Sequence, residues 1–230
     1  MSGPGAGGRR RWWRWLLAGV VLLVVIVVAG AALFVKSQPS AAPLTLPSGT
    51  ARPPTGPADG TWDAAAGSVA GFRIRESVLG FGDEVAGRTT VVTGTAAIAG
   101  DQLTSAVFRV GLTAITVGGK SRPQIAASLD TAAHPGATIT LAGPVRLPAG
   151  FGLGRTVTAV LPGQLTLRGV TRPVTITVSA RRDGATVEVA GSLPVASARW
   201  GIALPAGFGF LGGLSSEATG EFLLVLHRRW

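Results

Sequence analysis

Histidine, cysteine, serine and paired carboxylates are the residues that would carry metal or nucleophilic chemistry, and this sequence offers few of them. The chain contains no cysteine, which excludes thiol catalysis and disulfides. Its two histidines, His134 and His227, lack the His-x-His or Glu-x-x-His spacing of metal ligands. No Gly-x-Ser-x-Gly motif marks a serine nucleophile, and no carboxylate pair stands out. We therefore expect no metal site, no catalytic residues and no enzyme activity.

The positive charge of the chain does not indicate nucleic-acid binding. The formal net charge is +10. However, five basic residues flank a single apolar run: Arg9, Arg10, Arg11, Arg14 and Lys36. The remainder is only mildly basic, as expected for the solvated surface of an ordinary domain.

The stretch GQLTLRGVTRPVTITV, residues 163–178, alternates between apolar and polar residues on both sides of Arg168-Gly169. This pattern predicts a β-hairpin with two different faces. Gly169 permits the tight turn. Pro173 has no amide donor, so we expect it at a strand start or an irregular position. The apolar face would turn inward and comprises Leu165, Leu167, Val174, Ile176 and Val178.

From residue 60 onward the same period-2 pattern recurs, separated by Gly, Pro and Asp, without a long segment of helical period. About eight such segments predict an all-β domain, either an antiparallel barrel or a sandwich. A barrel is favoured because it has no free edge. A long Thr-rich strand is expected to break at Gly94. Further apolar faces carry Phe72, Ile74, Phe108 and Val110.

Two segments interrupt this pattern of strands. Residues 121–136 predict one short helix over an end of the barrel, with Ser121 as N-cap, Pro123 in the first turn and a stop at Pro135-Gly136. Residues 204–214 form a Gly-rich loop that carries Phe208 and Phe210. This loop is either an apolar lid or a connection whose aromatic residues fill the core.

The N-terminal part of the chain predicts a membrane anchor and a spacer. Leu16–Val35 carries no charge and is long enough for a helix to cross a hydrocarbon core of ~30 Å. Residues 1–15 would be a cytoplasmic basic tail, following the positive-inside rule. A cleaved signal peptide ending near Ala29-Gly30-Ala31 is the alternative. Residues 36–59 are Pro-rich and predict a linker with nothing to pack, reaching at most about 70 Å.

Several segments in this order resemble the YceI-like family over about residues 60–228. The hairpin quoted above is the most specific; the others are TWDAAAGSVAGFRIRE, VAGRTTVVTGTAAI, SRPQIAASLDTAAHPGATITL and SARWGIALP. The resemblance implies a lipocalin-like antiparallel barrel with an apolar tunnel, in an exported and non-enzymatic carrier of polyisoprenoids or isoprenoid quinones. The chain departs from the family pattern at Pro123, at Ile139, and in its anchor and linker.

The resemblance and the predicted anchor together indicate a membrane-tethered, extracytoplasmic lipid-binding barrel at residues 60–230, with no cofactor besides a possible bound isoprenoid lipid or quinone. The alternatives are an envelope interaction module with a filled barrel and, as the weakest, an enzyme acting on lipid. The lipid and the oligomeric state cannot be read from the sequence. Candidate head-group contacts are Arg122, Arg168, Arg172 and Arg199; the more conservative interpretation of each is a solvated surface residue. Candidate cavity-lining residues are Phe72, Ile74, Phe108, Val110, Leu165, Leu167, Val174, Ile176, Val178, Trp200, Phe208 and Phe210.

Overall fold

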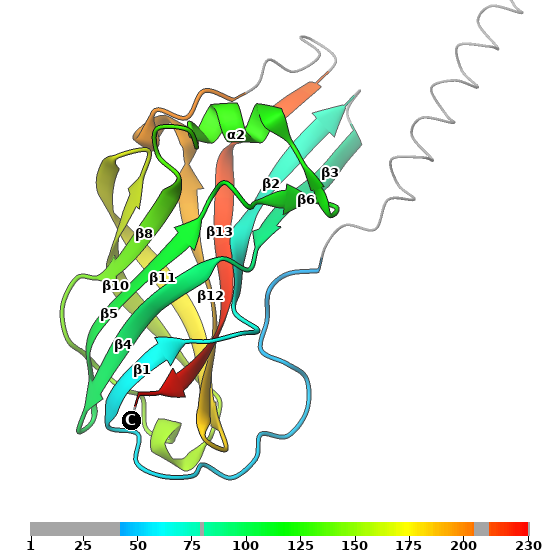
Figure 1. Ribbon diagram of the computed structural model, residues 1–230. Coiled ribbons are helices and arrows are strands. Elements are labelled where there is room, and N and C mark those ends of the chain that lie inside the picture. The colour runs from blue at the N-terminus through cyan, green and yellow to red at the C-terminus, as the bar shows by residue number, and fades with distance from the viewer. Residues whose placement is uncertain (1–41, 79–80, 205–211, 230) are drawn as a thin grey trace, which may run out of the picture. The chain divides into compact units, whose positions relative to one another are not determined.

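A computed structural model describes residues 42–78, 81–204 and 212–229 of the chain. The strands among these residues form one sheet in which all pairings are antiparallel (Figure 1). Eight of them close into a barrel, because β1 pairs with β4 on one side and with β13 on the other. In order around the barrel these are β1 (Gly60–Ala64), β4 (Val92–Ala99), β5 (Gln102–Gly111), β8 (Gly136–Leu141), β10 (Val157–Leu167), β11 (Val170–Asp183), β12 (Thr186–Ala196) and β13 (Gly212–Arg228).

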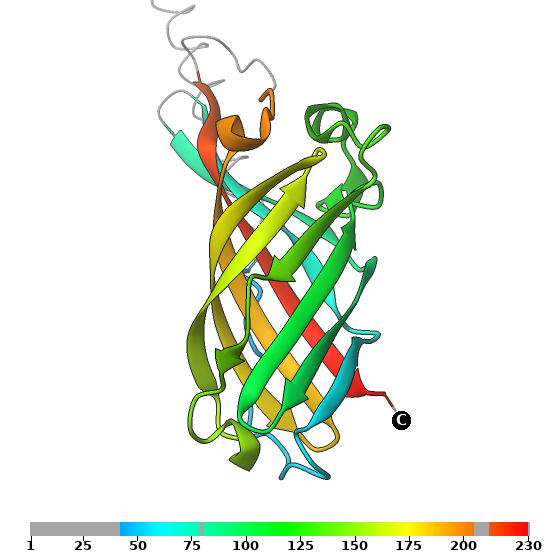
Figure 2. The same cartoon turned by 90° about the vertical axis from the view of Figure 1, so that its left-hand side faces the viewer.

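A second group of strands extends the barrel wall beyond β1. The first part of β13 pairs with β2 (Val69–Val78) rather than with β1, and β2 pairs with β3 (Phe81–Thr89). The short strands β6 (Thr116–Val117) and β7 (Lys120–Ser121) continue this wall. Figure 2 shows the strands inclined to the long axis of the barrel, as closure of a sheet requires. Of the two predicted all-β architectures, the barrel is therefore confirmed.

The predicted break at Gly94 is wrong. The Thr-rich stretch divides at Thr90 and Val91, between β3 and β4, whereas Gly94 lies inside β4. Gly94 has a φ of +142°, and a side chain there would overlap the backbone carbonyl of Val107 on β5. This glycine allows two strands to approach each other closely and does not end a strand.

The hairpin of β10 and β11 has the predicted faces. Leu167 pairs with Val170, and the two loop residues Arg168 and Gly169 both have positive φ, 51° and 72°. This is the left-handed conformation of a type I′ turn. The apolar face predicted from the sequence is buried, while Thr175 and Thr177 on the other face are exposed.

Pro173 lies within β11 and not at its start. It is paired with Gln164 of β10, but β12 pairs with β11 only from Thr177 onward in the described part of the chain. Pro173 therefore occupies a stretch with a partner on one side, where the missing amide donor leaves no ladder bond unmade.

The predicted helix forms as α2 (Pro123–Leu129) and lies across one end of the barrel (Figure 1). Pro123 stands in the first turn as predicted, but the N-cap is Arg122 and not Ser121, which belongs to β7. The helix also ends earlier than predicted, because Asp130 adopts the left-handed conformation and its amide donates to the carbonyls of Ala126 and Ala127. The 3-10 helix η1 (Phe151–Leu153) lies at the opposite end of the barrel, and a second one, η2 (Ser197–Trp200), follows β12.

Residues 42–59, which we call the strap, pack against the barrel. They contain no helix or strand, yet they run along the outside of the barrel and below it to reach β1 (Figure 1). The amide of Thr55 donates to the carbonyl of Gly184, and the amide of Gly184 donates to that of Arg52. The compact unit begins at Ser40. The expectation that the linker has nothing to pack is therefore wrong for these residues.

The predicted cytoplasmic tail, the anchor at Leu16–Val35 and the aromatic residues Phe208 and Phe210 lie outside the described residues. Within 42–78, 81–204 and 212–229, no helix combines the length and apolar character that crossing a membrane requires.

Candidate functional site

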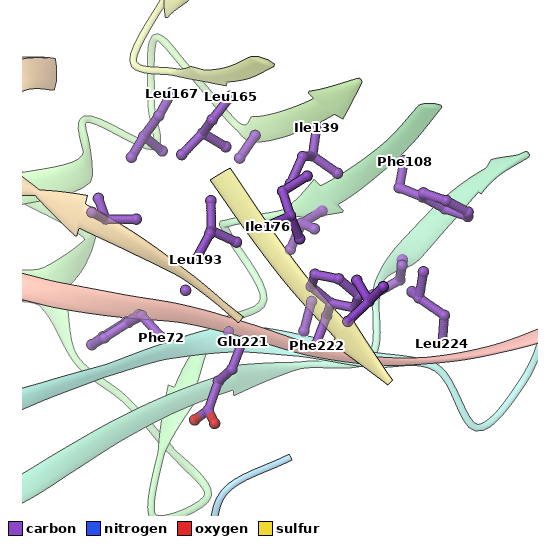
Figure 3. Close-up of a pocket in the computed structure, with 18 of the residues that line it drawn as sticks. Phe72, Phe108, Ile139, Leu165, Leu167, Ile176, Leu193, Glu221, Phe222 and Leu224 are labelled. Atoms are coloured by element: carbon purple, nitrogen blue, oxygen red, sulfur yellow. The ribbon is translucent and has the colours of Figure 1, made fainter. Parts of the chain in front are cut away.

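The barrel encloses an apolar cavity of about 560 Å³. Side chains from the inner faces of the barrel strands and of β2 surround it, and Figure 3 shows them converging from several strands. The alternation of each strand explains this arrangement, since every second residue points to the same side of a sheet. Two buried apolar clusters, one on the α2 side and one around Trp62 and Phe151, supply most of the lining.

The structure brings eight of the twelve predicted lining residues to the cavity: Phe72, Ile74, Phe108, Val110, Leu165, Leu167, Ile176 and Val178. Val174 and Trp200 are buried in the core but do not line the cavity. Trp200 belongs to η2, and its indole Nε1 donates to the carbonyl oxygen of Leu165 at 3.3 Å, so the ring packs against the hairpin in the same buried cluster as Leu165. Whether the eight residues contact a ligand stays a prediction.

Several cavity residues were not singled out from the sequence. Leu161 and Ala159 continue the inward face of β10 below Leu165, and Phe222 and Leu224 occupy the inward face of β13. The sequence does contain a signal for these residues. The apolar alternation of Leu165 and Leu167 extends toward the N-terminus to Leu161 in steps of two, and GEFLLVLH, residues 220–227, has the same period. Further lining residues from other strands are Ile139, Val187, Leu193 and Val195.

Polar side chains border the cavity at the α2 end. Arg122, Gln124 and Ser128 line it from α2 and its N-cap, and Glu76 lines it from β2. Arg122 is thus the one candidate head-group residue among the four that the structure places at the cavity. The side chains of Arg122 and Gln124 are mostly exposed, so this end combines solvent access with hydrogen-bonding groups.

The other three candidate arginines do not line the cavity. Arg172 pairs with Leu165 across the hairpin, is exposed near the turn, and donates from Nε to the carbonyl of Arg199 at 3.4 Å. Arg199 donates in return to the carbonyl of Pro173 at 3.3 Å, and its guanidinium lies 5.3 Å from the centre of the Trp200 ring. Arg168 occupies the hairpin turn. By the strand period Arg172 shares the face of Val174 and Ile176, but it lies nearer the hairpin turn and is exposed, and Arg199 belongs to η2.

A buried carboxylate in the wall of the barrel faces away from the cavity. Glu221 of β13 is 5% exposed, and Figure 3 shows its carboxylate directed away from the apolar side chains. Its Oε1 lies 2.6 Å from Nη2 of Arg88 and 3.4 Å from Nη2 of Arg73, and its Oε2 accepts from the amide of Leu44 at 3.1 Å. The strap therefore covers this ion pair from outside.

Two further buried arginines are held by the strap. Arg181 pairs with Glu188 at 2.8 Å and donates from Nη1 to the carbonyl of Gly49 at 3.0 Å. Arg182, 3% exposed, donates from Nη2 to the carbonyls of Thr55 and Gly56 at 2.9 and 2.7 Å. Burial lowers the pKa of Arg182, but an arginine keeps its proton at neutral pH. These contacts fix the strap to β11.

The described residues hold no group of three or more His, Cys, Asp or Glu side chains that could bind a metal ion. His134, one of the two histidines, lies beside the hairpin turn, close enough that a side chain at Gly169 would meet its ring at 3.0 Å. It also lies 3.9 Å from Asp130 at the end of α2. Its surroundings are those of a turn residue that packs on the hairpin.

In a comparison with known families, a family model described as YceI-like domain matches residues 61–219. A comparison with curated protein sequences gives no match.

Comparison with solved structures finds the same fold in other proteins. One is a polyisoprenoid binding domain from Saccharophagus degradans implicated in plant cell wall breakdown, with a TM-score of 0.57 at 20% identity; the match covers 74% of this chain and 98% of that one. Another is BcnA of Burkholderia cenocepacia, with a TM-score of 0.50 at 17% identity, covering 68% of this chain and 95% of that one.

Proposed function

The chain belongs to the YceI-like family, and we propose that its barrel binds a long apolar lipid, a polyisoprenoid or an isoprenoid quinone, with the hydrocarbon chain inside the barrel. The observation that carries this proposal is the apolar cavity of about 560 Å³. Protein interiors are normally packed to the density of organic crystals, and their voids rarely exceed a water molecule in size. A space of this volume, lined by aliphatic and aromatic side chains, is typical of a ligand pocket.

The chemistry of the lining favours a hydrocarbon over a polar ligand. Burial of each methylene group contributes roughly 0.8 kcal/mol before ordering costs, so a long chain gains affinity without specific hydrogen bonds. Polar groups are concentrated at the α2 end, where Arg122 and Gln124 are available to a head group. The domain from Saccharophagus degradans, which has the same fold, is described as polyisoprenoid binding, and this supports the ligand class.

The proposal includes tethering to the outer face of the membrane through Leu16–Val35. It is supported by the absence of charge and the length of that segment and by the arginines before it. The binding role assigned to the barrel does not depend on the tether. A mature chain that begins near Ala32 and is found in the soluble fraction would contradict the tether and leave the lipid proposal intact.

Native mass spectrometry of the full-length chain in detergent tests the binding role. We expect a co-purifying apolar species in the parent. Leu167→Gln and Ile176→Gln introduce an amide into the cavity lining, where an unpartnered amide costs roughly 1–3 kcal/mol. Both variants should lose most of the bound lipid and melt at a lower temperature.

Thr175→Gln is the matched control, because Thr175 is the neighbour of Ile176 on the exposed face of the same strand. It should keep both lipid and stability. A parent chain that carries no lipid and takes up none from added polyprenol would reject the carrier role and favour an envelope interaction module. Lipid loss in the Thr175 variant alone would contradict the assignment of the faces.

A further inference from the structure

The barrel wall is incomplete along one stretch of β10. β8 pairs with β10 from Thr138–Thr166 to Leu141–Gly163, and the last bond of this ladder runs from the amide of Ala142 to the carbonyl of Pro162. Below it the chain leaves β10: strand β9 (Val145–Arg146) pairs with β5 instead. In the described part of the chain, residues 157–161 of β10 therefore have no strand partner on this side.

We call the space between residues 145–148 and residues 157–161 the seam. The cavity extends to both of its sides. Val145, Arg146, Leu147 and Pro148 line the cavity from one side, and Val157, Ala159 and Leu161 line it from the other. The side chain of Arg146 is also 82% exposed. A residue that lines the cavity and is mostly in water marks a place where the interior reaches the outer surface.

The seam is separate from the α2 end of the cavity. Along β10, Leu161 and Thr166 are five residues apart, which corresponds to roughly 17 Å of strand. Thr166 pairs with Thr171 next to the hairpin turn, whereas residues 157–161 approach the η1 end. The cavity thus has a polar border near α2 and a second border, lined mainly by apolar side chains, at the seam.

Two large apolar side chains are exposed on the outer surface beside the seam. Val160 on the outer face of β10 is 62% exposed, and Leu153 in η1 is 73% exposed. Leu153 precedes β10 in the chain, and Val160 lies in the part of β10 that forms one side of the seam. Arg146, the charged residue among the described residues that line the seam, forms an ion pair with Asp101, whose Oδ2 accepts from Arg146 Nε at 2.6 Å.

From this arrangement we propose that the seam is a side exit for the hydrocarbon chain. This inference rests on the proposed lipid-binding function. A cavity of about 560 Å³ lies within the range of roughly 300–1,000 Å³ that holds drug-sized ligands, and a polyisoprenoid of roughly 50 carbons is larger than these. The head group stays near α2, the first isoprene units fill the cavity, and the far end of a long chain passes between β9 and β10 onto the surface near Val160. The protein then selects its ligand by head group and by the first units, without an upper limit on chain length.

Site-specific fluorescence tests the exit. The chain has no cysteine, so Val160→Cys in the full-length protein provides a single attachment point for a fluorophore beside the seam. Thr171→Cys is the control, since it is exposed on the same outer face of the same hairpin but near the turn. The probes are two polyprenols with a nitroxide quencher at the end remote from the hydroxyl: one of about three isoprene units, which the cavity encloses, and one of about ten.

With the long probe bound, the label at position 160 should lose most of its fluorescence and the label at 171 should keep it. The short probe should quench neither label, although native mass spectrometry shows it bound. Quenching at 171 by the long probe, or at neither position, would overturn the side exit while the binding function stands. Failure of both probes to bind would reject the proposed function itself. A dimer in native mass spectrometry, without quenching at position 160, would indicate that a second copy of the chain pairs with the free edge of β10. That result would also overturn the side exit.

Discussion

Removal of the strap should destabilise the barrel strongly, even though the strap contains almost no regular secondary structure. The perturbation is a comparison between a chain that starts at Ser40 and one that starts at Gly60. The shorter chain loses the carbonyls of Thr55 and Gly56 that accept from Arg182, the carbonyl of Gly49 that accepts from Arg181, and the amide of Leu44 that donates to Glu221.

These contacts set the expected magnitude. Each hydrogen bond to a charged group contributes roughly 1.5–3 kcal/mol. Without the strap, water will reach the charged groups of Arg181, Arg182 and Glu221 and replace part of each lost hydrogen bond. The lower value of about 1.5 kcal/mol therefore applies to each of the four hydrogen bonds, and the loss of stability is about 6 kcal/mol. Typical domains have a free energy of unfolding of about 5–15 kcal/mol. The chain that starts at Gly60 should therefore be marginal or unfolded.

Urea denaturation followed by circular dichroism measures the difference. We expect a cooperative transition for the chain from Ser40, and a much lower midpoint or no transition for the chain from Gly60. Arg52→Ala in the longer chain is the control, because Arg52 is 74% exposed and its pair with Asp183 lies at the surface, where ion pairs contribute little. Equal midpoints for the two chains would refute the reasoning and favour the sequence-based expectation that residues 36–59 have nothing to pack.

Two further predictions concern single positions. Gly71→Ala should prevent stable folding or lower the free energy of unfolding by more than ~3 kcal/mol, because the new methyl group would overlap the backbone carbonyl of Gly87 on the neighbouring strand. The control is Gly143→Ala, which has open space around it and should melt at the same temperature as the parent. The side chain and the amide of Arg52 donate to Asp183 and lower its pKa. The stabilisation from Asp183 is therefore fully present above the unfolded pKa of about 3.9. It is lost as the pH falls through the lower pKa of the folded state. The difference in thermal midpoint between the parent and Asp183→Asn should therefore shrink between about pH 6 and pH 2, and a difference that is constant with pH would contradict this role.

The barrel and its inward faces were predictable from the sequence because they depend on local alternation. The hairpin shows this most clearly: Leu165, Leu167 and Ile176 were placed on the inner face by period alone, and the turn by Gly169. Residues such as Phe222 were missed although the same period marks them. Trp200 was predicted at the cavity wrongly, because its place depends on how η2 folds back on the hairpin, which no short-range pattern encodes.

The role of the strap could not be predicted from the same signals. Its contacts run mostly from backbone carbonyls to arginines more than a hundred residues away, so its own side chains show no periodicity. One sequence feature does point to the strap. In SARRD, residues 179–183, Arg182 continues the inward face of Val178 and Ala180. An arginine at an inward position requires a partner, and here backbone carbonyls of the strap supply it. The seam could not be predicted from the sequence either, because it depends on the pairing of β9 with β5.

The packing of the strap also changes how far the barrel can travel from a membrane. Counted as free spacer, residues 36–59 would let it move up to about 70 Å away. With residues 42–59 fixed on the barrel, the proposed anchor ending at Val35 is separated from Ala42 by about seven Cα–Cα steps, or about 25 Å of fully extended chain. A shorter connection confines the barrel to a smaller volume and raises its effective concentration at the bilayer surface. A tethered barrel of this kind would take up lipid from the membrane beside it in an intramolecular encounter, and would be too closely held to shuttle between two membranes.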